Sequence, residues 1–124
     1  MKVLLQGSKD FDDYQVLMRA MGVALSSMQP GDKEFQIYSV GPHKTNDLAL
    51  SFTNLTEDSL KGRGIKAKFH TLPAKLAEDK IDRFDYMIYV SNPENRRLSA
   101  LTNKAEENGI ELGIFRYWCL VKRI

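Results

Sequence analysis

The chain has few of the residues and segments that mark secreted, metal-binding or membrane-spanning proteins. Among 124 residues there are one cysteine and two histidines. A single cysteine excludes an intrachain disulfide and a cysteine zinc cluster, and it fits a reducing cytoplasm. No apolar run approaches the roughly 20 residues of a membrane span, and the first run is too short for a signal peptide. We therefore expect a cytoplasmic protein with no metal site and no cofactor.

Neither sign of charge dominates the chain. Lys and Arg number 18 and Asp and Glu number 16, which gives a net charge of +2. This weakly basic balance neither demands nor excludes a polyanionic partner. A hydrophobic content of 43% is sufficient for one core. We expect a single domain over residues 1–124.

Apolar runs alternate with amphipathic segments along the chain. This order is typical of parallel βαβ units, so it predicts an α/β fold, a three-layer sandwich around a mostly parallel sheet of about five strands. The expected strands are 3–5, 35–40, 65–72, 85–90 and 110–115, and the expected helices are 12–28, a segment from a cap at Thr45, Asn46 or Asp47 to residue 62, a short helix at Pro73, and 96–107.

The segment 117–124 exceeds what such a sheet needs, and we interpret it as a C-terminal extension. It contains Trp118, Leu120, Val121 and Ile124 among cations. It can form a subunit contact or an added edge strand, and it favours a homo-oligomer. Cys119, inside this apolar group, is interpreted as a packing residue.

The turn after the first strand is the strongest local signal for a ligand. The run Val3–Leu5 ends at Gly7 and Ser8, and helix-forming residues follow. A helix N-terminus offers unpaired N–H groups that can hold a phosphate, and glycine permits close approach. The alternative is a plain turn in which Ser8 or Asp10 caps the helix. Lys9 beside it can neutralise a phosphate or be a solvated surface residue.

Two further loops are expected beside this turn. Ligands of parallel sheets bind beyond the carboxyl ends of the strands, near a switch in strand order. Those ends here are Gly7–Ser8, residues 41–46 and residues 91–95. We expect the three loops to converge on one edge of the sheet.

Several short motifs resemble the SLOG superfamily (SMF/DprA and LOG), most closely its small YspA-like proteins. They are the strand and Gly-Ser-Lys turn at 3–11, the segment Val-Gly-Pro-His-Lys-Thr-Asn-Asp-Leu-Ala at 40–49, the strand at 84–90, and the helix and strand at 105–115. The resemblance covers residues 2–116. It implies a Rossmann-like sheet that binds a nucleotide or nucleotide-derived molecule through the three loops.

The chain departs from that family at two of the loops. Where the family has a pair of glycines, this chain has Gly41 and Pro42, and the proline removes a backbone donor. The LOG-type hydrolases carry Pro-Gly-Gly-x-Gly-Thr and a catalytic glutamate, whereas the matching segment 92–97 reads Asn-Pro-Glu-Asn-Arg-Arg, without glycine. This disfavours catalysis of that type. Binding is less affected, because Lys44, Arg96 and Arg97 can replace lost N–H contacts with charge.

We therefore predict non-catalytic binding of a nucleotide-type small molecule, for sensing or sequestering, in bacterial or phage nucleotide signalling. The predicted site residues are Gly7, Ser8, Lys9, Gly41, His43, Lys44, Asn46, Asp47, Ser91, Asn92, Glu94, Asn95, Arg96 and Arg97. One alternative is a nucleotide hydrolase that uses Glu94, Asp47 or His43. The second is nucleic-acid binding as in the DprA branch, through Lys44, Lys61, Arg63, Lys66, Lys68, Arg96 and Arg97.

Several polar side chains have two interpretations. Asp10, Asp12 and Asp13 can hold Mg²⁺, but first-turn acids that favour the helix dipole are the preferred interpretation. Asp47 caps the second helix or contacts a ribose, and the cap is preferred. His70 borders the site or is a structural histidine with its hydrogen bonds satisfied, and the latter is preferred.

Overall fold

The computed structural model describes residues 1–91 and 99–116, in which strands and helices alternate. The strands are β1 (Lys2–Gly7), β2 (Glu34–Ser39), β3 (Lys66–Thr71), β4 (Tyr86–Ser91) and β5 (Glu111–Arg116). The helices are α1 (Tyr14–Ser26), α2 (His43–Gly62), α3 (Ala74–Asp79) and α4 (Ala100–Glu107), with a 3-10 turn, η1 (Ile81–Arg83), before β4. The α/β class is confirmed.

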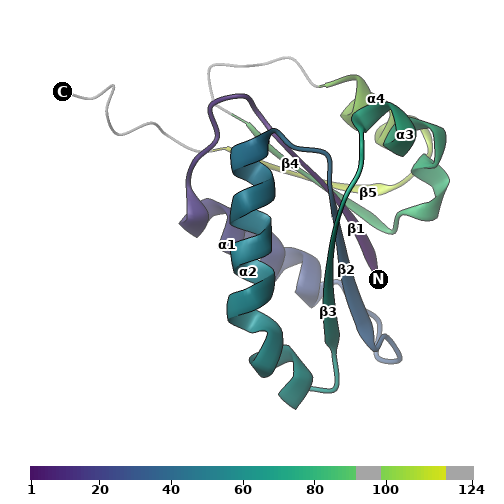
Figure 1. Cartoon of the computed structure of the whole chain (residues 1–124). Coiled ribbons are helices and arrows are strands. Elements are labelled where there is room, and N and C mark those ends of the chain that lie inside the picture. The colour runs from purple at the N-terminus through teal and green to yellow at the C-terminus, as the bar shows by residue number, and fades with distance from the viewer. Residues whose placement is uncertain (92–98, 117–124) are drawn as a thin grey trace.

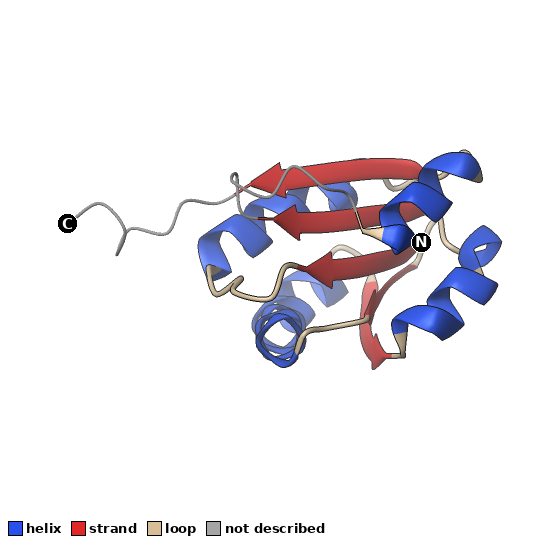
Figure 2. Ribbon diagram, turned by 90° about the horizontal axis from the view of Figure 1, so that it is seen from above, coloured by secondary structure: helices blue, strands red, loops and turns tan. Residues whose placement is uncertain are grey.

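The five strands form one parallel sheet in the order β3-β2-β1-β4-β5. Helices flank it on both sides, which gives a Rossmann-like three-layer sandwich (Figures 1 and 2). The chain runs outward from β1 to β3, then returns past β1 to place β4 on its other side. The order therefore switches between β1 and β4, where α/β sheets of this kind hold ligands.

One face of the sheet is fully covered by α1 and α2. Val3 and Leu5 of β1 and Phe35 and Ile37 of β2 are completely buried there. They pack with the apolar stripes of α1 and α2, whose buried members are Leu17, Ala20, Met21, Ala24, Ala49 and Phe52. This is the larger of the two cores.

The opposite face is covered by α3, η1 and α4. Leu4 of β1 and Met87 of β4 are buried against Ala77 of α3 and Leu101 of α4. These helices have 6 and 8 residues, against 13 and 20 in α1 and α2. Their shortness leaves the side chains of β2 and β3 on this face only partly covered.

The first helix begins where a carboxylate satisfies its free N–H groups. Asp13 is the N-cap of α1, and its Oδ1 accepts the backbone N–H of Gln15 at 3.0 Å and of Val16 at 3.2 Å. The expected helix at 12–28 is therefore two residues too long at each end. The expected caps, Ser8 and Asp10, lie upstream of the true cap.

The second helix begins earlier than predicted. Pro42 is its N-cap and His43 its first residue, so a cap at Thr45, Asn46 or Asp47 is wrong. Proline fits this position because its missing N–H is not needed at a helix start. Leu55 of this helix is 72% exposed.

The last helix begins at Ala100 instead of residue 96, because Ser99 caps it by accepting the N–H of Thr102 at 3.1 Å. The predicted extension 117–124, with Trp118 and Cys119, lies outside the described residues. In residues 1–91 and 99–116, no helix combines the length and the apolar character needed to cross a bilayer.

Candidate functional site

The ends of β1, β2 and β4 meet at one edge of the sheet, as expected. The N–H of Gly7 donates to the carbonyl of Gly41 at 3.1 Å, and the N–H of Ser8 donates to the carbonyl of Val90 at 2.8 Å. Ser8 thus lies between the carboxyl ends of β1 and β4, at the switch in strand order. Residues from three distant parts of the chain are joined directly by hydrogen bonds.

These hydrogen bonds change which atoms can receive an anion. The N–H groups of Gly7 and Ser8, expected to cradle a phosphate, already donate within the sheet. The nearest helix in sequence, α1, begins only at Tyr14, and the Asp13 carboxylate occupies its N-terminus. Lys9 is exposed on the connecting loop. Unpaired backbone donors at this edge therefore come from another element.

The N-terminus of α2 supplies such donors. Among residues 1–91 and 99–116 no side chain caps this helix, and its first intrahelical bond runs from the N–H of Asn46 to the carbonyl of Pro42. The N–H groups of His43, Lys44 and Thr45 precede that bond and have no intrahelical acceptor. Gly41 lies immediately before the helix at φ +93°, a conformation that glycine adopts without strain.

Gly7 lets α2 approach β1 closely. A Cβ on Gly7 would collide with the Oγ1 of Thr45 and lie 3.2 Å from the Phe11 ring. Thr45 is completely buried, and its Oγ1 has no hydrogen-bond partner among the described residues. The sequence thus has glycine here for helix–strand packing, which brings the α2 N-terminus beside the β1 turn.

Polar side chains of the first two turns of α2 pair with their neighbours. His43 Nε2 lies 3.3 Å from Asp47 Oδ2, and Lys44 Nζ lies 3.7 Å from Asp12 Oδ2. His43 is 89% exposed and Asp47 65%, so the pair contributes little to stability. The preferred interpretation of Asp47 as a helix cap is wrong, because it lies in the second turn and contacts His43.

Ser39 and Asn46 connect the end of β2 to α2 inside the protein. The Ser39 hydroxyl, completely buried, donates to Asn46 Oδ1 at 2.5 Å and accepts the Gly41 N–H at 3.4 Å. This bond fixes the Asn46 amide, and its Nδ2 hydrogens remain available as donors. Sequence patterns did not single out Ser39, although a serine that ends a buried strand is a usable signal.

The three acids after β1 do not gather around a cation. Asp13 caps α1, Asp12 pairs with Lys44, and Asp10 Oδ1 accepts the Ser8 hydroxyl at 3.3 Å. Among the described residues no group of three His, Cys, Asp or Glu side chains is placed to bind a metal. The acids are thus a cap, an ion-pair partner and a turn residue.

The third loop is only partly described. Ser91 ends β4 and is buried at 1% exposure. The predicted site residues Asn92, Glu94, Asn95, Arg96 and Arg97 lie outside the described residues.

His70 lies on the other face of the sheet, away from α2. It stacks on Tyr38 with ring centroids 4.6 Å apart, and Tyr38 meets Phe84 edge-on at 5.3 Å. The His70 Nε2 is buried and has no hydrogen-bond partner in the described part of the chain. The prediction that His70 is a structural histidine with its hydrogen bonds satisfied is therefore wrong. The three rings border a cavity of about 320 Å³.

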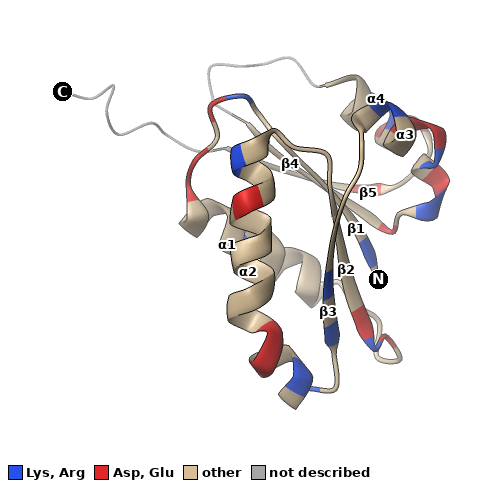
Figure 3. Cartoon of the chain, in the orientation of Figure 1, with Lys and Arg blue, Asp and Glu red and all other residues tan. Residues whose placement is uncertain are grey.

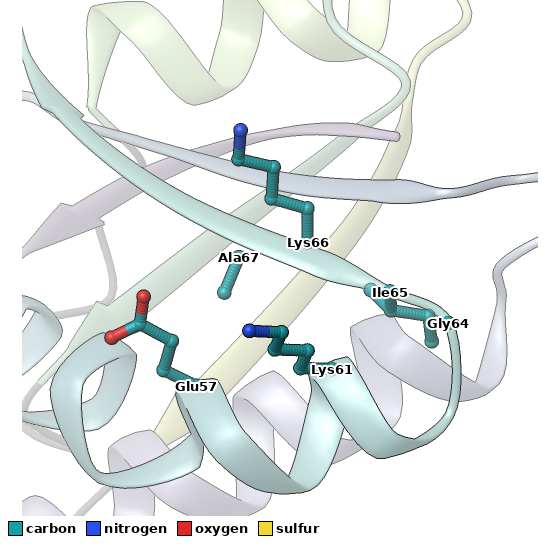
Figure 4. Close-up of a pocket in the computed structure, with 6 residues that line it drawn as sticks. All are labelled: Glu57, Lys61, Gly64, Ile65, Lys66 and Ala67. Carbon is teal, nitrogen blue, oxygen red and sulfur yellow. The ribbon is translucent and has the colours of Figure 1, made fainter.

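A second cavity, of about 470 Å³, lies between the C-terminal end of α2 and β3 (Figure 4). Glu57 and Lys61 of α2 lie on the same side of β3 as Ala67, whereas Lys66 is directed to the other side. The lining thus combines two cations, Lys61 and Lys66, with the carboxylate of Glu57, which disfavours an anion there.

Comparisons with protein-family models, with curated proteins and with solved structures found no match.

Proposed function

We propose that the protein binds a nucleotide or nucleotide-derived molecule, without chemical turnover, at the carboxyl edge of β1, β2 and β4. The observation that carries this proposal is the α2 N-terminus. No side chain in the described part of the chain caps it, it follows Gly41, and it lies against Gly7 at the β1 turn. The expected residues Gly7, Ser8, Gly41, Lys44 and Asn46 thereby come from elements in direct contact.

Charge at this helix end favours a phosphate. The 20 residues of α2 align their peptide dipoles, so the positive end lies at His43 and Lys44. Lys44 adds a formal positive charge that is 65% exposed, and its 3.7 Å pair with Asp12 is easily exchanged for a phosphate. At α1, by contrast, the Asp13 carboxylate already occupies the equivalent position.

The exposure of His43 supports binding instead of turnover. A general base works within hydrogen-bond reach of the proton that it removes, usually in a site that excludes water. His43 is 89% exposed, and its contact in the described part of the chain is Asp47. The segment 92–97 also lacks the glycines of the resembling hydrolases.

Isothermal titration calorimetry with AMP, ADP, cyclic AMP and ADP-ribose tests the proposal. We expect Lys44→Ala to raise the dissociation constant of the nucleotide about tenfold, which corresponds to the loss of one charge-assisted contact. Lys61→Ala is the matched control, because it removes the same charge from the opposite end of the same helix. No heat with any probe, or equal losses in both variants, contradicts the proposal.

Turnover is measured separately. We expect the wild-type protein to release neither free base nor phosphate from these nucleotides, as followed by chromatography. Release that disappears in His43→Ala would favour the hydrolase alternative.

A further inference from the structure

We propose that the cavity between β2, β3 and the α3–β4 connection is a second binding site, for a small aromatic molecule that carries a phosphate or carboxylate. It lies across the sheet from the α2 N-terminus, since Tyr38 faces α3 whereas its neighbour Ser39 faces α2. This site is independent of the proposed function.

The apolar wall of the cavity is aromatic. Tyr38 and His70 are partners in the β2–β3 register and stack with an interplanar angle of 21°. Phe84 closes one side by an edge-on contact with Tyr38. Stacked and edge-on arrangements are the favoured geometries of aromatic rings, so a further ring in the cavity extends an existing cluster.

The Tyr38 ring is held in place before any ligand binds. Its hydroxyl donates to Gln36 Oε1 at 2.9 Å, and Gln36 Nε2 donates to Glu34 Oε2 at 2.9 Å. Lys68 Nζ lies 3.1 Å from Glu34 Oε1 and completes the chain. A ring fixed in this way loses little entropy when a ligand packs on it.

The charged wall of the cavity is positive. Lys2, Lys80 and Arg83 line it, from the start of β1 and from the segment after α3. Figure 3 shows Lys and Arg in blue at the start of β1 and among the helices on the right, where Asp and Glu, in red, also occur. No carboxylate lines this cavity among the described residues, and none of the ion pairs found there involves these cations. The Asp85 carboxylate nearby already accepts the Lys2 backbone N–H at 2.8 Å.

Three cations beside three rings, without a facing carboxylate, favour a ligand that is both planar and anionic. Like charges repel unless an anion lies between them, and arginine binds phosphate or carboxylate with two parallel hydrogen bonds. The volume of about 320 Å³ is in the range of small-molecule sites. The buried His70 Nε2, which has no hydrogen-bond partner among the described residues, adds an unsatisfied polar group beside the cavity.

The two histidines of the chain allow the two sites to be followed at once. His43 reports on the α2 N-terminus and His70 on the cavity, and His43→Gln assigns their imidazole signals in carbon–proton NMR spectra. We titrate the full chain with phenyl phosphate, AMP and inorganic phosphate. We expect phenyl phosphate to shift the His70 signals, and to do so at about tenfold lower concentration than inorganic phosphate. AMP tests whether a mononucleotide is the source of this chemistry.

Arg83→Ala and Arg63→Ala form the matched pair of variants. Both remove an exposed arginine, but only Arg83 lines this cavity. We expect Arg83→Ala to lower the affinity for phenyl phosphate, followed by the His70 signals, about tenfold. Arg63→Ala is expected to leave this affinity unchanged. Tyr38→Phe keeps the ring but removes its hydrogen bond to Gln36, so we expect it to weaken binding less than Arg83→Ala does.

Three outcomes overturn the proposal. The first is that phenyl phosphate and AMP leave His70 unmoved. The second is that inorganic phosphate acts equally well. The third is that a short single-stranded oligonucleotide binds more tightly than AMP with a steep salt dependence, which assigns this face to nucleic acid. Because His43 is read in the same spectra, loss of the His70 response is distinguishable from failure of the α2 site.

Discussion

The two faces of the sheet are built differently although the same strands contribute to both. On the α1/α2 face, fully buried side chains from β1, β2 and β4 pack against long helices. On the α3/α4 face, the short helices cover β1 and β4, and β2 and β3 carry a polar chain and a cavity. One face thus supplies most of the apolar burial, and the other has room for recognition.

The most direct test of this difference replaces one phenylalanine on each face by alanine. Phe35 is completely buried under α2, whereas Phe84 is 7% exposed and borders the cavity. We expect Phe35→Ala to lower the free energy of unfolding by about 3–5 kcal/mol, and Phe84→Ala by roughly half of that, because its surroundings are already open. Urea unfolding followed by circular dichroism measures both. Equal losses would show that the two faces are equally well packed.

A smaller effect is expected where the tightly packed face meets the proposed nucleotide site. Gly7→Ala places a Cβ against Thr45 Oγ1, so we expect a loss of about 1–3 kcal/mol from overpacking. In a Thr45→Ala background the loss is expected to shrink, since the colliding hydroxyl is gone. Gly22→Ala is the control, because nothing lies within 4 Å of its added Cβ in α1. That change is expected to stabilise the helix by about 0.5–1 kcal/mol.

The sequence predicts the strands well because their signal is local. The runs at Val3–Leu5 and 86–90 are continuously apolar, as is typical of strands that are buried on both faces of a parallel sheet. The start of α2 was misplaced, because its N-cap is Pro42, for which no side-chain cap is found among the described residues, and the capping residues at 45–47 gave a false signal. Convergence of the loops followed from topology alone.

The cavity on the α3/α4 face was not predictable in the same way. Tyr38 and His70 become neighbours only through the β2–β3 register. The periodicity of a single segment carries no information about that register. Alternation in both strands, with Gln36 and Tyr38 opposite Lys68 and His70, was the signal available.

The smallest expected effect concerns the polar chain that holds Tyr38. The Lys68 ammonium, by hydrogen bond first and then by charge, lowers the pKa of Glu34. A lowered pKa means that the Glu34 contribution to stability is present above the unfolded value of about 4.3 and is lost as pH falls through the folded value.

We expect Lys68→Gln to raise the pKa of Glu34 toward that value, as followed by NMR of its carboxyl carbon, while Lys61→Gln leaves it unchanged. The stability of the wild type should then fall faster below about pH 4.3 than that of Lys68→Gln. If Glu34 titrates identically in all three proteins, Lys68 does not stabilise the hydrogen-bonded series Glu34–Gln36–Tyr38. Tyr38 would then be held by Gln36 and by stacking on His70, without the charge of Lys68.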